Sequence, residues 1–270
     1  MLKKLFPCLP HCRILLLGLL VQSAAARTWT DQKGRKIEAE FKSVSKGTVI
    51  LVQPSGKVIH TALLNLSETD RRYISEKLRG KAQEKAAAGN AYAQAVLGEM
   101  YENGSGGPRD IREAVKWYRK AAEQGHATGQ NSLGLMYYIG TGVAQDLKEA
   151  ARWYRKAADQ GNANAQYNLG MLYESGKGVP QDDRAAARWY RKAAEQGDAN
   201  AQVMLGGMCA KGVGVPRDLV EAYAWFNLAG AGGMAHATKS RELLRKNMGP
   251  ALITRARERS RELHGIITGK

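Results

Sequence analysis

The stretch HATGQNSLGLMYYIGTGVAQDLKEAARWYRKAADQG, residues 126–161, contains the pattern that decides the fold. Its last residue is one of five glycines that follow one another at a constant interval of 36 residues: Gly89, Gly125, Gly161, Gly197 and Gly233. A fixed period of this size is typical of stacked-repeat arrays, in which each unit buries its apolar face only against its neighbours. The sequence therefore predicts a mainly α-helical protein, an α/α solenoid with four helix pairs of 36 residues over residues 89–233.

One unit divides into two helices. Residues 127–139 have apolar side chains at helical spacing, and the glycine-rich loop 140–143 ends this first helix. Asp146 is positioned to cap a second helix, and Glu149 three residues later suggests a capping box. Gly161 is expected to end the second helix as a C′ glycine.

A glycine also recurs in the middle of each first helix, where it costs about 1 kcal/mol relative to alanine. Its recurrence suggests a packing reason: without a Cβ, the paired helix with its Trp and Tyr side chains can approach closely. The glycines are Gly98, Gly134, Gly170 and Gly206.

The repeated motif A-x-A-Q-x-x-L-G-x-x-Y, then G-x-G-V-P-x-D, then E-A-x-x-W-Y-R-K-A-A-x-Q-G resembles the Sel1-like repeat, a relative of the tetratricopeptide repeat. The resemblance covers residues 89–233 and implies a right-handed solenoid that works as an adaptor in protein complexes. The last unit departs from the motif at residues 224–230 and resembles the terminal unit of such arrays. Residues 235–247 and 251–264, within the basic C-terminal segment 234–270, fit two capping helices.

Cysteine-rich members of this family pair cysteines within each repeat and have been linked to β-lactam binding. This chain lacks those cysteines, so that activity is not expected here. Cys209 stands where other repeats have tyrosine, which favours a small core filler over a nucleophile.

Residues 27–78 show a different pattern, with short alternating and β-branched runs separated by turns, as in a small antiparallel β-barrel. The segment 27–31, the strand 37–41 and the motif Leu66-Ser67-x-x-Asp70-x-x-Tyr73-Ile74 resemble the SLA1 homology domain, an SH3-like module. A helix is expected from Ser67 through Leu78, and residues 79–88 are assigned to a linker or N-terminal cap.

In endocytic adaptors the SLA1 homology domain binds short peptides that contain an acidic residue. If that property holds, basic side chains of this domain would contact the acidic residue, although ordinary solvated strand charges explain them equally well. The candidates are Lys33, Arg35, Lys36 and Lys42.

Residues 1–26 have the three parts of a secretory signal: basic residues, a short apolar run at 14–21 and small residues at 23–26. We therefore expect an exported protein, periplasmic or secreted, with no transmembrane segment after cleavage. The alternative is an uncleaved interfacial anchor.

The formal net charge of +16 is concentrated towards the ends of the chain: residues 27–80 carry +5 and residues 234–270 carry +6, against +2 for residues 81–233. These charges are interpreted as serving solubility, and the alternative is an anionic partner such as acidic lipid or polysaccharide. No nucleic-acid motif is present, so nucleic acid is not expected as a partner.

The sequence contains no His/Cys cluster with metal-ligand spacing, no Walker loop, no dinucleotide fingerprint and no G-x-S-x-G elbow. No cofactor and no enzymatic activity are predicted.

The candidate binding residues come from a comparison of the four units. Positions 3, 6, 10 and 13 residues after each opening glycine vary most and share one face of the first helix. In tetratricopeptide-like arrays the first helices line the concave surface, where tyrosine, asparagine and glutamate suit peptide recognition. The alternative is an unconstrained exposed face. The candidates are Tyr92, Glu99, Asn131, Tyr138, Asn164, Tyr167 and Glu174.

A second, basic stripe lies on the second helices at Arg119/Lys120, Arg155/Lys156 and Arg191/Lys192. It is interpreted as a solvated convex face, or as a surface for an anionic partner. The leading hypothesis is thus an exported, non-enzymatic adaptor that binds a protein or peptide on the concave face. The alternative is a cell-envelope binder of anionic glycan or lipid.

Overall fold

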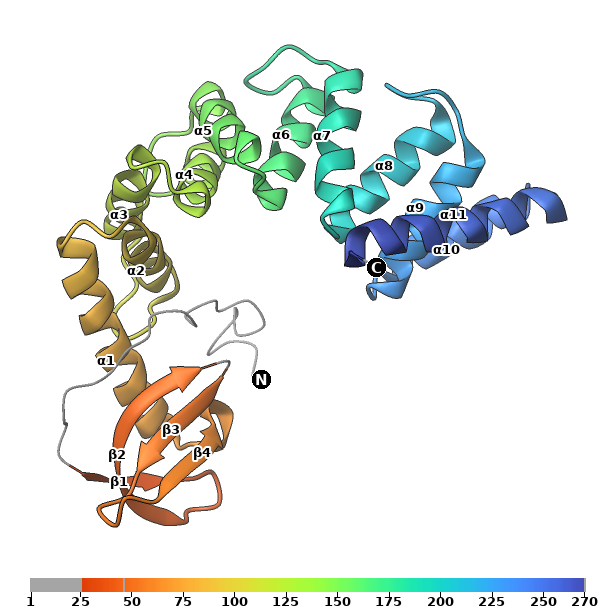
Figure 1. Cartoon of the computed structure of the whole chain (residues 1–270). Coiled ribbons are helices and arrows are strands. Elements are labelled where there is room, and N and C mark those ends of the chain that lie inside the picture. The colour runs from red at the N-terminus through yellow and green to blue at the C-terminus, as the bar shows by residue number, and fades with distance from the viewer. Residues whose placement is uncertain (1–25, 46, 270) are drawn as a thin grey trace. The chain divides into compact units, whose positions relative to one another are not determined.

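The computed structural model describes residues 26–45 and 47–269 and confirms the expected fold class, a small antiparallel β domain followed by helix-pair repeats (Figure 1). The chain forms two compact units, one ending at Ala114 and the other beginning at Val115. The predicted signal segment falls outside the described residues except for its last residue. Within the described ranges no helix is both long and apolar enough to cross a membrane.

Four strands, β1 (Arg27–Thr30), β2 (Lys36–Ser45), β3 (Thr48–Val52) and β4 (Val58–Ala62), form an antiparallel sheet in chain order. An irregularity between Phe41 and Ser43 lets β2 pair with β1 through its first half and with β3 through its second half. After β4, a 3-10 turn leads to a bridge between Leu66 and Asp31 at the end of β1. This bridge brings the two ends of the meander together, as an SH3-like barrel requires.

The helix α1 (Glu68–Ala87) is fixed to the sheet by the buried carboxylate of Asp70. That carboxylate accepts hydrogen bonds from the Arg27 guanidinium at 2.8 Å, the Thr30 backbone N–H at 2.6 Å and the Ser67 hydroxyl at 2.9 Å. Three donors compensate the cost of burying a charged group. The motif that resembles the SLA1 homology domain therefore joins a strand to a helix.

The helix α1 runs nine residues beyond Leu78, where the sequence analysis ended it. Its C-terminal half buries Ala82 and Ala86, and the Ala86 carbonyl accepts a hydrogen bond from the side chain of Gln94. Residues 79–87 are therefore helical and serve as the second helix of a half repeat, which is why the helix continues.

The repeats form antiparallel helix pairs (Figure 1). In the first unit, α2 (Ala91–Asn103) follows α1, and α3 (Ile111–Glu123) crosses the boundary between the units. The second unit contains α4 (Ala127–Ile139), α5 (Leu147–Asp159), α6 (Ala163–Ser175), α7 (Asp183–Glu195), α8 (Ala199–Lys211) and α9 (Leu219–Ala231). We call α2, α4, α6 and α8 the first helices, and α3, α5, α7 and α9 the second helices.

The expected cap at Asp146 is present, since its carboxylate accepts from the backbone N–H groups of Lys148 and Glu149. The capping box is not closed, however. The Glu149 carboxylate pairs with Arg152, and the Asp146 N–H donates to the Tyr137 carbonyl instead. The first helices have caps that the sequence analysis missed, at Asn90, His126, Asn162 and Asp198.

The glutamine that recurs every 36 residues joins successive helix pairs. Each side-chain amide is buried and donates to a carbonyl near the end of the preceding second helix, at 3.1–3.2 Å. In the second unit Gln160 and Gln196 add a further bond each, to Gln130 and Gln166. These contacts keep the first helices in register with their neighbours.

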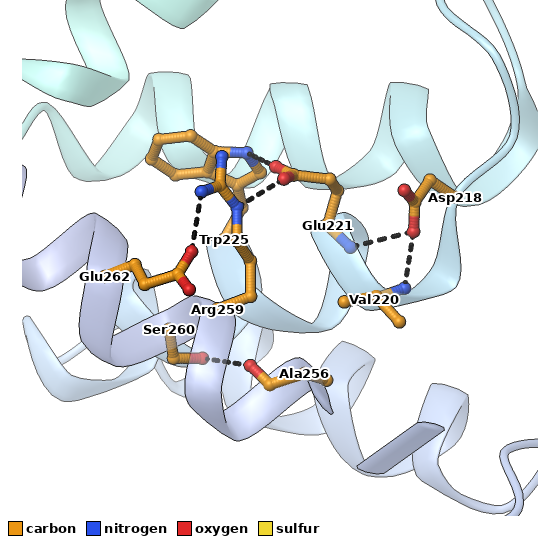
Figure 2. A network of polar contacts seen from close by, with 8 residues as sticks. All are labelled: Asp218, Val220, Glu221, Trp225, Ala256, Arg259, Ser260 and Glu262. Carbon is orange, nitrogen blue, oxygen red and sulfur yellow. Dashed lines mark hydrogen bonds and ion pairs between the residues drawn. The ribbon is translucent and has the colours of Figure 1, made fainter. Parts of the chain in front are cut away.

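Two further helices, α10 (Ala235–Arg245) and α11 (Pro250–Thr268), occur where capping helices were expected. The helix α11 packs against α9, and a polar network joins them (Figure 2). Glu221 accepts hydrogen bonds from the indole N–H of Trp225 at 3.1 Å and from Arg259 at 2.5 Å, while Arg259 also pairs with Glu262.

Candidate functional site

The mid-helix glycines lie against aromatic rings, as predicted. A Cβ added at Gly134 would lie 2.8 Å from the Tyr154 ring, and one at Gly170 would lie 2.7 Å from the Tyr190 ring. The contacting ring belongs to tyrosine and not to the neighbouring tryptophan. Gly134 and Gly170 thus let a buried tyrosine of α5 and of α7 lie against the first helix, and at Gly206 the ring is that of Phe226 on α9.

The first-helix face of the second unit, as we define it, consists of Asn131 and Tyr138 on α4 together with Asn164, Tyr167 and Glu174 on α6. Asn164 is exposed and the other four are half-buried. The predicted positions of these two helices therefore retain solvent access, which a binding surface needs.

A fixed aromatic and acidic cluster forms the part of this face on α6. The hydroxyl of the buried Tyr190 donates to the Glu174 carboxylate at 2.7 Å. The half-buried ring of Tyr167 packs on the Tyr190 ring, with centroids 5.8 Å apart. Burial is the main cause that raises the pKa of both tyrosines. Both phenols are therefore protonated at neutral pH, and the O–H of Tyr190 is already engaged by Glu174.

Polar contacts also link α4 to α6. The side-chain amide of Asn168 donates to the Asn131 oxygen at 3.1 Å. The ammonium of Lys177, which follows α6, lies 6.0 Å from the Tyr138 ring centroid. Neighbouring repeats thus share one continuous polar and aromatic surface on the first-helix face.

The first unit holds the other two predicted residues, Tyr92 and Glu99, both half-buried on α2. Burial raises the pKa of Glu99, and the nearby Glu102 adds to the shift.

The four cations predicted for the β domain are not equivalent. Arg35 pairs with Asp31 at 2.6 Å and Lys42 pairs with Glu40 at 2.8 Å. Hydrogen bonds, above all from the Arg35 backbone N–H, lower the pKa of Asp31. Lys33 and Lys36 are exposed, close to the β1–β2 turn. Of the four predicted cations, Lys33 and Lys36 therefore have no ion pair with another described residue and could pair with an acidic residue of a ligand.

Sequence reasoning missed Arg27. Its guanidinium lies 4.0 Å from the Tyr73 ring centroid and 5.0 Å from that of Trp29, and it pairs with buried Asp70. These contacts tie the half-buried Arg27 to the core of the domain. The motif offered a signal for Arg27, because it contains both of the residues that Arg27 contacts, Asp70 and Tyr73.

The basic stripe divides into two sets of residues. Arg119 donates to the Tyr137 hydroxyl at 2.8 Å, and Arg155 donates to the Tyr173 hydroxyl, so these arginines join successive helices. The lysines remain exposed, each with its ammonium 4.2–4.4 Å from the tryptophan ring centroid of its own helix. They are Lys120, Lys156 and Lys192.

Cys209 is 2% exposed and packs in the core between α7, α8 and α9, in agreement with its interpretation as a small core filler. Burial raises the pKa of its thiol to about 11. A thiol of that pKa is protonated at neutral pH and therefore a poor nucleophile. No group of three or more potential metal ligands occurs in the described part of the chain.

The residues that sequence reasoning left out of the face are Asn168, Lys177 and the second-helix Tyr190. Tyr190 was assigned to the core, which is correct for its ring, but its hydroxyl reaches Glu174. The sequence did offer a signal for this pair. In the last repeat, 36 residues further on, Phe226 stands in place of Tyr190 and Ala210 stands in place of Glu174, so both partners of the hydrogen bond are lost together.

Paired helices with a recurring glycine–tyrosine contact and an exposed polar first-helix face define a helical repeat scaffold. The family model described as Sel1 repeat matches residues 91–126, 127–162, 163–198 and 199–234, so the chain belongs to the Sel1 repeat family. The model described as SLA1 homology domain 1 matches residues 21–82.

A solved structure agrees with this assignment. A Sel1 repeat protein from Oxalobacter formigenes is 35% identical, with 71% of this chain and 76% of that chain covered and a TM-score of 0.60. A protective antigen of uropathogenic Escherichia coli is also 35% identical, over 70% of this chain and 48% of that chain, with a TM-score of 0.49. No curated protein matches significantly. Sel1 repeats typically mediate protein binding, and the family consists in general of non-catalytic scaffolds.

Proposed function

We propose that this protein is an exported, non-enzymatic adaptor that binds a protein or peptide on its first-helix face. The observation that carries the proposal is the cluster of Tyr167, Tyr190 and Glu174. A half-exposed aromatic ring lies on a buried ring whose hydroxyl is held by a carboxylate. Rigid tyrosines at a half-exposed surface give contact area at low entropic cost, which is typical of binding surfaces.

The ligand chemistry follows from the side chains of the face. Asn131 and Asn164 provide amide donors and acceptors that match a peptide backbone, and Tyr138 and Tyr167 provide amphipathic rings. Glu174 contributes the negative charge of the α6 part of the face. We therefore expect an extended segment that carries apolar side chains and a donor or basic group near α6.

Export is part of the proposal and rests on the composition of residues 1–26. Fractionation of cells that express the full chain tests it directly. Recovery of a shortened chain from the periplasm or medium supports export. A full-length chain confined to the cytoplasm contradicts it.

The binding proposal is tested by capture from cell-envelope extract with the chain 27–270 and with the triple variant Asn131→Ala, Tyr138→Ala, Tyr167→Ala. A matched control, Lys120→Ala, Lys156→Ala, Lys192→Ala, changes the second helices of the same unit. We expect the face variant to lose the partner and the lysine variant to keep it. Circular dichroism and thermal melting of each variant check that the repeats stay folded.

The row of exposed lysines favours a second candidate function, binding to an anionic envelope surface. Each lysine is held over a tryptophan ring, so the three ammonium groups are fixed on one stripe of the unit. Co-sedimentation with anionic vesicles at low and high salt tests it, because contacts between exposed charges weaken steeply with ionic strength. If the lysine variant no longer binds vesicles while the face variant still does, the result would assign the binding function to this lysine stripe.

A further inference from the structure

The strand β4 leaves one edge of the sheet in the β domain open. The sheet order is β1-β2-β3-β4, so β4 pairs with β3 on one side and with no other strand of the described ranges (Figure 1). The bridge that brings the ends of the meander together joins Leu66 to Asp31, beyond the end of β4. An open edge presents a row of backbone N–H and C=O groups with which another strand can pair.

The outer edge of β1, at the other end of the sheet, is already occupied. The Thr30 N–H donates to the Asp70 carboxylate at 2.6 Å, and the Thr30 carbonyl accepts from the Ser67 N–H at 2.7 Å. The residues that begin α1 thus satisfy the backbone of β1. The strand β4 has no equivalent contacts within the described part of the chain, so its edge is the open one.

Hydrogen bonds beyond the two ends of β4 determine which of its backbone groups face outward. The Lys57 carbonyl accepts from the Gln53 N–H, and the Leu63 N–H donates to the Gly47 carbonyl. Backbone groups alternate between the two edges of a strand, so the odd-numbered residues from 57 to 63 face β3. The residues between them face outward, and all three are exposed. These outward-facing residues are Val58, His60 and Ala62.

The exposed apolar side chains of the first unit lie at the ends of this edge. Val58 is 51% exposed and Leu64 is 54% exposed, and no other large hydrophobic side chain among the described residues up to Ala114 is exposed. Val58 begins β4, and Leu64 lies in the 3-10 turn that follows it. Charged side chains, proline or a bulge commonly protect an open edge, and the β4 sequence Val-Ile-His-Thr-Ala contains no Lys, Arg, Asp, Glu or Pro. The edge is therefore suited to a partner strand.

The charge around the edge distinguishes between possible partners. Residues 47–66 contain Lys57 and His60 and no acid, and residues 27–80 carry a net charge of +5. Two copies of this chain paired through β4 would bring two positively charged domains together, which Coulomb repulsion opposes. A segment with acidic side chains instead gains from the same charge, because opposite charges on neighbouring strands attract.

We propose that the open edge of β4 binds an extended segment of a partner protein, with alternating acidic and apolar residues, which adds to the sheet as its next strand. Main-chain hydrogen bonds to Val58, His60 and Ala62 give the affinity. An apolar side chain packs beside Val58, and an acidic side chain pairs with Lys57. This site is separate from the first-helix face, and either site can fail without the other.

Ala62 allows a variant that changes the edge alone. Its φ is −65°, the value that proline requires, and its N–H faces outward, so Ala62→Pro fits the backbone and removes one docking donor. The matched control is Ala62→Val, which keeps the N–H. Circular dichroism and thermal melting check that both variants fold as the parent does.

The full chain is titrated into two fluorescein-labelled eight-residue peptides, and binding is measured by anisotropy. One peptide is Thr-Val-Glu-Val-Glu-Val-Glu-Thr, and the other has lysine in place of each glutamate. We expect the parent and Ala62→Val to bind the glutamate peptide within about twofold of each other. Ala62→Pro should bind it at least about tenfold more weakly, as for the loss of one hydrogen bond, and the lysine peptide should bind the parent at least about tenfold more weakly.

Four results overturn the proposal. Equal binding by the parent and Ala62→Pro excludes the β4 edge as the site, and equal binding of the two peptides excludes an acidic partner. Failure of the parent to bind the glutamate peptide at about 1 mM excludes the strand itself. Self-association of the parent in sedimentation, absent from Ala62→Pro, would assign the edge to a second copy.

Amide exchange followed by NMR on the parent gives a readout that requires no variant. Without peptide, the outward N–H groups of Val58, His60 and Ala62 should exchange as unprotected amides, whereas those of Ile59 and Thr61, which face β3, should exchange slowly. Saturating glutamate peptide should slow exchange of the three outward amides at least about tenfold. Peptide binding that leaves these three rates unchanged would place the peptide elsewhere and overturn the proposal.

Discussion

The third repeat (α6 and α7) and the fourth repeat (α8 and α9) have the same backbone and different surfaces. Both place a ring over a mid-helix glycine and close their loop with a glycine against the preceding repeat. They differ where side chains meet: Tyr190 and Glu174 become Phe226 and Ala210, and Tyr173 becomes Cys209. The period thus determines the backbone contacts, and the position in the array determines the polar ones.

The largest effect is expected where the two repeats agree. A Cβ at Gly178 would lie 2.1 Å from the Leu147 carbonyl oxygen, and one at Gly214 would lie 2.2 Å from that of Asp183. Because backbone must move, Gly178→Ala and Gly214→Ala should each lower the free energy of unfolding by about 3 kcal/mol or more. Urea denaturation measures the loss.

The control for that prediction is Gly161→Ala. Gly161 also has a positive φ, of 86°, but a Cβ there would have open space around it. Only the conformational cost of about 1–2 kcal/mol applies. Equal losses at Gly161 and Gly178 would show that backbone conformation alone explains both, and that the contact between repeats contributes nothing.

The next effect separates the two repeats. Tyr190→Phe removes the hydrogen bond to Glu174 and should destabilise by about 1–2 kcal/mol. Phe226→Tyr places a buried hydroxyl opposite Ala210, with a loss of about 1–3 kcal/mol. Adding Ala210→Glu to Phe226→Tyr should recover part of it. A double variant no more stable than Phe226→Tyr alone would contradict the pairing, and thermal melts of all four chains decide.

A third comparison concerns the glutamates that precede the tryptophans. Glu221 accepts from Trp225 on its own helix and pairs with Arg259 across the α9–α11 interface (Figure 2). Glu149 instead contacts exposed Arg152 on its own helix. We expect Glu221→Ala to cost about 1–3 kcal/mol and Glu149→Ala no more than about 0.5 kcal/mol. Chemical denaturation of the two variants is the measurement. Similar small losses would mean that apolar packing alone holds α11 on α9.

The sequence predicts what depends on spacing along one helix or on the repeat interval. The helix pairs, the cap at Asp146, the C′ glycine Gly161 and the close approach at Gly170 all follow from such spacing. Contacts between helices were not predictable in this way. Tyr190 and Glu174 are 16 residues apart and Arg155 and Tyr173 are 18, so their pairing depends on how two helices pack. The predicted binding role of the first-helix face stays a prediction.

The smallest effect tests the link between successive repeats. Arg155 donates to the Tyr173 hydroxyl and lies 5.5 Å from the Trp189 ring centroid, whereas the corresponding Arg191 lies near the thiol of Cys209. A protonated thiol is a weak acceptor and presents no aromatic ring. We expect Arg155→Ala to cost about 1 kcal/mol and Arg191→Ala about half of that or less, measured by urea denaturation at constant m-value.

Lys156→Ala and Lys192→Ala are the matched controls for these arginine changes, because each lysine is adjacent and exposed. Each lysine change should alter the free energy of unfolding by less than about 0.5 kcal/mol. If Arg191→Ala cost as much as Arg155→Ala, the arginine would stabilise both repeats through packing of its aliphatic stem. The tyrosine hydroxyl would then not be the contact that distinguishes an internal repeat from the terminal one.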